Sequence, residues 1–119
     1  MFIGVSAANA LKGEWVKKMN KPIIFAMANP VPEIFPEDAM QNGAYIYGSG
    51  RSDFQNQINN SLVFPGIFRG IKEHQLKDIP IEMHIRVAEG LAKAVGDKLS
   101  ENFILPDSLN LDISKLISE

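Results

Sequence analysis

Three short apolar runs divide the first half of the chain, and each ends in small or polar residues. The runs are residues 2–7 (FIGVSA), 22–29 (PIIFAMAN) and 44–50 (AYIYGSG). Apolar runs of this length that are rich in β-branched and aromatic side chains are typical of strands buried in a sheet. The continuous run at 22–29 further predicts a strand that is covered on both faces, as in a parallel sheet.

Helical patterns separate these runs. Residues 12–20 carry apolar side chains three and four positions apart, which predicts a short helix. Residues 36–41 start with a proline and two acids, as first helical turns often do, and Asn42-Gly43 predicts the end of that helix. The resulting order of elements predicts an α/β fold with a right-handed βαβαβ unit, which is half of a doubly wound, Rossmann-like parallel sheet.

Two longer helices are expected after the sheet. The first runs from the amides Asn59 and Asn60 to about Lys72, with Pro65 one turn inside it, where a proline removes a hydrogen bond and bends a helix. The second begins after Asp78–Pro80 and ends near Gly96. Its apolar stripe comprises Ile81, Ile85, Ala88, Leu91, Ala92 and Val95.

Composition limits the classes of protein to consider. A chain of 119 residues suits one domain, with 1–78 forming the βαβαβ unit and a helix, and 79–119 the last helix and a tail. The net charge of −2 and scattered basic residues argue against nucleic acid as a partner. The absence of cysteine excludes disulfides and thiol chemistry and agrees with a cytoplasmic location. No apolar run reaches the roughly 18 residues of a membrane span.

The strand ends are the expected ligand site. In doubly wound folds, ligands bind at the carboxyl ends of the strands, which here are Ser6-Ala7, Ala28-Asn29 and Gly48–Gly50. The usual G-x-G-x-x-G dinucleotide fingerprint is missing from the sequence. We therefore expect this chain to be the second half of a domain whose first half lies elsewhere.

Two long strings carry a specific resemblance to a known family. They are A-N-P-x-P-E-I, which starts at Ala28, and N-Q-x-N-N-x-x-x-F-P-G-I, which starts at Asn56. The chain resembles the C-terminal part of the NAD(P)-binding domain of malic enzymes of the short bacterial and archaeal type. That resemblance implies oxidative decarboxylation of malate to pyruvate and carbon dioxide, with NAD or NADP as cofactor and Mg or Mn as the metal.

The resemblance also implies roles for individual residues. Asn29 is similar to a residue that contacts malate beside the nicotinamide, and Asn59 and Asn60 resemble the second substrate contact. The segment Gly4, Val5, Ser6 and Ala7 resembles the loop under the adenosine side of the cofactor. Amides suit a dianionic substrate because they donate hydrogen bonds without adding charge. Structural roles stay open, with Asn29 as a turn former and Asn60 as a helix cap.

The catalytic groups of the family have no counterpart in this chain. In malic enzymes the general-acid tyrosine, the general-base lysine and three acidic metal ligands precede the matched region. We therefore assign no catalytic or metal-binding residue and expect the chain alone to be inactive. Its expected partners are malate or pyruvate and either a second copy or the remainder of the enzyme, bound near Phe2, Ile3 and Val5. The alternative is a non-catalytic nucleotide- or dicarboxylate-binding module, or a structural fragment.

Overall fold

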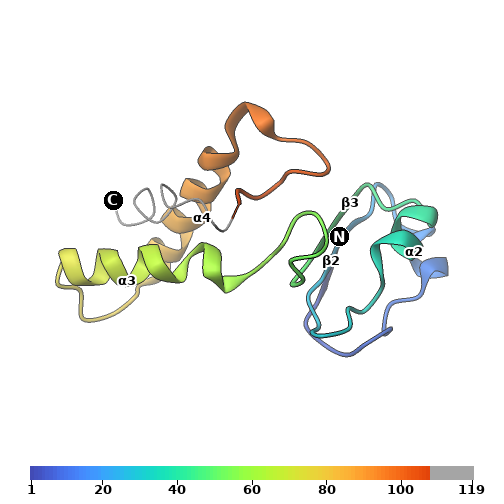
Figure 1. Ribbon diagram of the computed structural model, residues 1–119, viewed down its shortest axis with the longest axis horizontal. Helices are drawn as coiled ribbons and strands as arrows, with labels where there is room; N and C mark the ends of the chain where they lie inside the picture. Colours follow the sequence, from blue (N-terminus) through green and yellow to red (C-terminus); the bar gives the residue numbers. More distant parts are fainter. Residues whose placement is uncertain (108–119) are drawn as a thin grey trace. The chain divides into compact units, whose positions relative to one another are not determined.

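The computed structural model describes residues 1–107, which pack into two compact units (Figure 1). The first unit comprises Met1–Ile58 and Ser100–Phe103, and the second comprises Asn59–Leu99 and the chain from Ile104 onward in the described part. The expectation that 1–119 forms a single domain stays a prediction.

The first unit is a parallel sheet with a helix in each connection. Its elements in chain order are β1 (Phe2–Gly4), α1 (Gly13–Val16), β2 (Ile23–Ala26), α2 (Pro36–Gln41) and β3 (Ile46–Ser49). The strands lie in the order β1-β2-β3, and both neighbouring pairs are parallel. The predicted α/β class and βαβαβ order are confirmed.

Helices α1 and α2 pack together on one face of this sheet (Figure 1). Successive right-handed crossovers in one direction place both connecting helices on the same side. Val16 of α1 and Ala39 of α2 are fully buried in one cluster with Ile24 and Ala26 of β2. This cluster is the hydrophobic core of the first unit.

The opposite face of the sheet is less covered. Ile3 is 56% exposed, and Ile23 and Phe25 are only half-buried. The prediction that the strand in residues 22–29 is covered on both faces is met fully on the helix side and partly on the other face, where Ile23 and Phe25 keep some exposure. The apolar side chain of Ile3 stays accessible on this face of β1.

The ends of α2 follow the predicted signals. Pro36 begins the helix, Glu37 and Asp38 occupy its first turn, and Asn42 is its C-terminal cap. Gly43 follows with a φ of +91°, a backbone conformation that other residues adopt only with strain. The stop at Asn42-Gly43 is confirmed.

The second unit contains the two longer helices, α3 (Phe64–Glu73) and α4 (Ile81–Val95). The short 3-10 helices η1 (Asn60–Leu62) and η2 (Gly96–Lys98) precede α3 and follow α4. α3 and α4 share an apolar cluster built on the buried Ile67 and Val87. None of the helices in the described range is long and apolar enough to cross a membrane.

The packed face of α4 differs from the predicted stripe. Val87, Met83 and Leu91 contact the α3 cluster, whereas Ile81 is 66% and Ile85 54% exposed. α3 packs against a stripe formed by Met83, Val87 and Leu91, which shares only Leu91 with the predicted one. Of the predicted set, Val95 is buried and Leu91 is partly buried, while Ile81, Ile85, Ala88 and Ala92 are exposed.

The position of Pro65 also corrects the prediction. Asn59 and Asn60 do not start the long helix, because η1 and Val63 intervene and α3 begins at Phe64. Pro65 thus lies in the first turn of α3, where its missing N–H has no helical partner to lose. The proline starts a helix and does not bend one. Of the expected tail 99–119, residues 108–119 lie outside the described range.

Candidate functional site

The carboxyl ends of the three strands lie at one edge of the sheet, as predicted. Gly4 of β1 pairs with Ala26 of β2, which pairs with Ser49 of β3. The segments that follow these residues therefore leave the sheet side by side. This edge brings together residues 5–7 and residues 28–29, which the sequence selected for cofactor and substrate contacts.

The predicted cofactor segment splits into a buried and an exposed part. Val5 is 79% exposed, and Ser6 and Ala7 are also exposed, so this loop is open to a ligand. Gly4 is buried, and a Cβ there would lie 2.5 Å from Cδ of Glu33. Glycine at position 4 thus makes room for a carboxylate beneath the loop.

Glu33 is the polar centre of this edge, and the sequence analysis did not single it out. Its side chain is fully buried, with Oε1 accepting hydrogen bonds from Ser6 N at 2.8 Å and Ser6 Oγ at 3.2 Å. Oε2 accepts from Ala28 N at 3.0 Å. One carboxylate therefore binds the loop after β1 and the turn after β2.

The pKa of Glu33 reflects two opposing effects. Burial removes the carboxylate from water and raises its pKa, while hydrogen bonds from the backbone of Ser6 and Ala28 favour the charged form. The hydrogen bonds prevail, and the pKa of Glu33 lies below its ordinary value of 4.5. Glu33 is therefore an anion at neutral pH.

The turn that carries Asn29 is held on both sides. Ala28 N donates to Glu33, and the Pro30 carbonyl accepts a hydrogen bond of 2.8 Å from Nη1 of Arg51. The Asn29–Pro30 peptide bond is cis. Asn29 itself is exposed, and within residues 1–107 its side-chain amide has no hydrogen-bond partner. A fixed backbone thus presents a free amide at the sheet edge.

Arg51 is held in turn by its neighbours. Its guanidinium pairs with Asp53, with Nη2 at 2.6 Å from Oδ2, and lies 5.1 Å from the ring centroid of Phe54. The hydrogen bond from Arg51 lowers the pKa of Asp53. Arg51 is therefore ion-paired, with Asp53 as its partner.

Asn59 and Asn60 belong to the second unit. Asn59 caps η1, because its Oδ1 accepts a hydrogen bond of 2.9 Å from Ser61 N. The capping role that we considered for Asn60 therefore falls to Asn59. Both residues are exposed. That Asn29 and Asn59 meet the same substrate stays a prediction.

Another amide of the same segment is structural. Asn56 is 8% exposed and has a φ of +54°. Its Nδ2 donates to the carbonyl of Tyr47 at 2.9 Å and to that of Glu101 at 2.8 Å. The amide-rich run from residue 55 to 60 therefore mixes a buried anchor with exposed groups, and periodicity alone does not separate the two.

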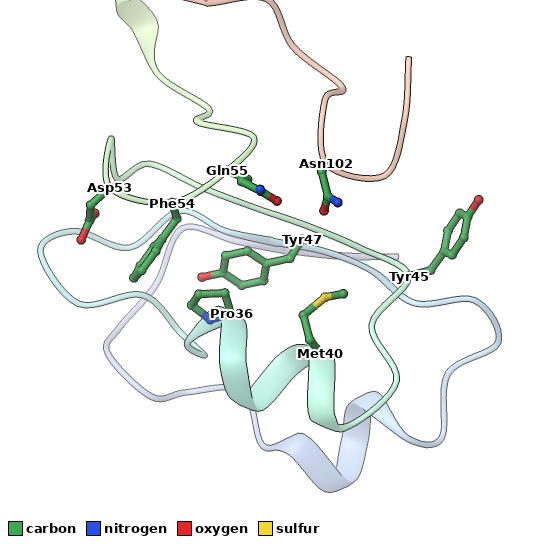
Figure 2. Close-up of a pocket in the computed structure, with 8 residues that line it drawn as sticks. All are labelled: Pro36, Met40, Tyr45, Tyr47, Asp53, Phe54, Gln55 and Asn102. Carbon is green, nitrogen blue, oxygen red and sulfur yellow. The ribbon is translucent and has the colours of Figure 1, made fainter. Parts of the chain in front are cut away.

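A cavity of about 360 Å³ lies beside α2, and none of the predicted site residues lines it (Figure 2). Pro36 and Met40 of α2 lie below it, and Tyr47 of β3 crosses it. Its other lining residues are Tyr45, Asp53, Phe54, Gln55 and Asn102. Burial raises the pKa of Tyr47 to about 12, and its hydroxyl donates to the Ile34 carbonyl. The cavity shares no residue with the predicted cofactor or substrate contacts.

The family assignment follows from comparison with known proteins. Residues 1–118 match the family model described as "Malic enzyme, NAD binding domain". The chain belongs to the malic enzyme family. This NAD-binding domain is 49% identical over 121 residues to the bifunctional malic/malolactic enzyme of Bacillus subtilis, covering all of this chain and 30% of that protein.

Other members of the malic enzyme family extend this comparison. The NADP-dependent malic enzyme of Rhizobium meliloti is 44% identical over 104 residues, covering 86% of this chain and 14% of that protein. The crystal structure of the NAD-dependent malic enzyme of Thermotoga maritima superposes with a TM-score of 0.91 at 44% identity, covering 98% of this chain and 30% of that one. The chain thus spans less than a third of the length of these relatives.

The family implies a nicotinamide cofactor and a divalent metal, and the described residues can be compared with the needs of each. Residues Val5–Ala7 and the amide of Asn29 are exposed, and they would offer a bound NAD or NADP an accessible loop and a hydrogen-bond donor. No group of three His, Cys, Asp or Glu in the part of the chain that the structure describes could hold a metal ion. Which residues of the chain contact the cofactor stays a prediction.

Proposed function

We propose that this chain forms the substrate- and cofactor-facing edge of an enzyme that oxidises and decarboxylates malate to pyruvate and carbon dioxide. The observation that carries the proposal is the exposed amide of Asn29 on a backbone held by Glu33 and Arg51. It lies at the same sheet edge as the exposed loop Val5–Ala7.

Asn29, Asn59 and Asn60 donate hydrogen bonds to the carboxylate or hydroxyl oxygens of malate in this proposal. Gly4, Val5, Ser6 and Ala7 support NAD or NADP, and Asn29 contacts both ligands. The bound nicotinamide supplies the hydride acceptor. A divalent metal, Mg or Mn, and the acid–base groups come from other parts of the enzyme. The whole assembly is a homo-oligomer or an association of this chain with the remainder of the enzyme.

The test is a hybrid enzyme in which this chain replaces the matching segment of the Bacillus subtilis relative. Asn29→Ala is expected to raise the KM for malate roughly 10- to 100-fold, because a hydrogen bond to a charged group contributes about 1.5–3 kcal/mol. Asn20→Ala is the matched control. Asn20 is also an exposed amide, but it precedes β2 and so lies near the amino ends of the strands, opposite the proposed site. Normal malate kinetics in Asn29→Ala, with reduced thermal stability, would establish the turn-forming role instead.

A binding module without turnover is the second candidate. It is favoured because no three-residue metal cluster occurs among residues 1–107. Isothermal titration of the 119-residue chain with NADH and with malate separates the two candidates. Binding of either ligand by the chain, together with an inactive hybrid enzyme, would support the module.

A further inference from the structure

Glu33 connects two segments that face different ligands in the proposed function. Its two carboxylate oxygens are divided between them, with Oε1 on Ser6 of the cofactor loop and Oε2 on Ala28, directly before Asn29. Because both oxygens belong to one rigid carboxylate group, a displacement of either segment displaces the anchor of the other.

The backbone around Glu33 strengthens the same connection. Leu11 N donates to the Glu33 carbonyl at 3.0 Å, and Asn9 N donates to the Pro32 carbonyl at 3.0 Å. The loop after β1 is therefore bonded to residues 32 and 33 at three places along its length. Main-chain bonds fix its far end, and the Glu33 side chain fixes the end nearest the strand.

The Glu33 side chain occupies a buried space that exists only because residue 4 is a glycine. Glu33 is fully buried, and its Cδ would lie 2.5 Å from a Cβ at position 4. Buried carboxylates are costly unless hydrogen bonds satisfy their oxygens, and three donors do so here. An apolar residue at position 33 would fill the space with less cost but would leave the N–H groups of Ser6 and Ala28 without acceptors.

We propose that Glu33 is a positioning residue that holds the loop Val5–Ala7 and the Ala28-Asn29 turn in one arrangement, so that cofactor and malate contacts depend on it together. This inference rests on the proposed function, because it assigns the two segments to two ligands. A purely structural Glu33 would lower stability when replaced but would leave both affinities intact in the folded enzyme.

The first test uses the unmodified 119-residue chain, labelled with ¹⁵N, and follows its amide resonances from pH 7 to pH 3. The Ser6 and Ala28 amides are expected to move together with one midpoint below 4.5, because they are bonded to the same carboxylate. Two different midpoints, or no movement at either amide, would overturn the inference. This measurement needs no substitution and no activity.

The second test uses the hybrid enzyme with Glu33→Gln. Glutamine keeps the shape but offers one acceptor oxygen in place of two, so one segment loses its anchor. The KM for malate and the KM for the cofactor are both expected to rise, with kcat/KM falling roughly tenfold or more, since a shift of about 1 Å can cost about 100-fold. Val16→Ala is the control, because it weakens the buried core of α1 without touching either segment.

The outcomes separate this inference from the proposed function. If Asn29→Ala raises the malate KM and Glu33→Gln changes neither KM, Glu33 is structural and the inference is wrong. If Asn29→Ala leaves malate kinetics normal, the proposed function fails, while common titration of Ser6 and Ala28 would still show that Glu33 joins the segments. Equal effects of Glu33→Gln and Val16→Ala on both KM values would also overturn the inference.

Discussion

Glu33 shows how a single residue organises the sheet edge. A carboxylate without access to water is unfavourable, and three hydrogen bonds from Ser6 and Ala28 compensate here. Asn29 shows the complementary arrangement, with a restrained backbone and an exposed side chain. An asparagine directly after an apolar run and before a proline is visible in the sequence. A glutamate that binds a segment 27 positions earlier is not.

The lowered pKa of Glu33 predicts an acid-dependent loss of stability. Because the folded pKa lies below the ordinary 4.5, the unfolded chain binds more protons in this range. The contribution of Glu33 is thus fully present above pH 4.5 and is lost as the pH falls through its folded pKa. Tyr47, whose pKa burial raises to about 12, stays protonated throughout.

Urea unfolding of the wild type and of Glu33→Gln at pH 7, 5, 4 and 3 measures this effect. We expect the substitution to cost on the order of 1–3 kcal/mol at pH 7, because a buried N–H loses its acceptor. The difference in unfolding free energy should shrink below pH 4.5. A difference that stays constant down to pH 3 would contradict the assigned protonation.

At the scale of elements, the helix pair α3–α4 depends on a choice between two apolar stripes. Val87 and Leu91 of α4 pack with Ile67 of α3, and Ile85 stays exposed. Periodicity finds amphipathic helices but does not determine which of two neighbouring stripes meets a partner. Pro65 is a similar case, because a proline one turn into a helix and a proline that starts one differ only in where the helix begins.

Two alanine substitutions test this assignment. Ile67→Ala is expected to lower the unfolding free energy by about 2–5 kcal/mol, because it removes a buried side chain and leaves a cavity. Ile85→Ala, which removes the same atoms from an exposed position, should change it by less than about 0.5 kcal/mol. Urea unfolding monitored by circular dichroism provides both values. If Ile85→Ala lowered the unfolding free energy more than Ile67→Ala does, the packed stripe would be the one predicted from the sequence.

At the scale of the whole chain, the open face and edge of the sheet predict association. β1 is an edge strand in the described sheet, Ile3 is 56% exposed and the adjoining Val5 is 79% exposed. Edge strands with apolar side chains pair readily with other chains. The region around Phe2, Ile3 and Val5 is therefore the expected contact with a second copy or with the remainder of the enzyme.

Sedimentation velocity at micromolar concentration tests whether this region binds a second copy of the chain. The apparent mass of the 119-residue chain is expected to exceed the 13.2 kDa of the monomer. Ile3→Lys should return it to the monomer, because charge on an edge strand opposes pairing. Ile85→Lys is the matched control on an exposed apolar site of α4. Dissociation by Ile85→Lys alone would place the contact on the second unit.

Signals between residues close together in the chain were sufficient to predict the strands, the ends of α2 and the family. Apolar run length located the three strands, the signals at Pro36 and Asn42-Gly43 located the ends of α2, and the strings around Asn29 and Asn59 identified the malic enzyme family. All of these depend on residues close together in the chain. Local backbone preference and side-chain periodicity are therefore sufficient to find them.

Contacts between groups that are distant in the sequence became visible only in the folded chain. It assigned Glu33 to Ser6 and Ala28, Arg51 to the Pro30 carbonyl and Asn56 to the carbonyls of Tyr47 and Glu101. It also selected the packed stripe of α4. A buried charge or a packed face is stable only with a particular partner, and that partner is chosen by the crossing of strands and helices far apart in the sequence.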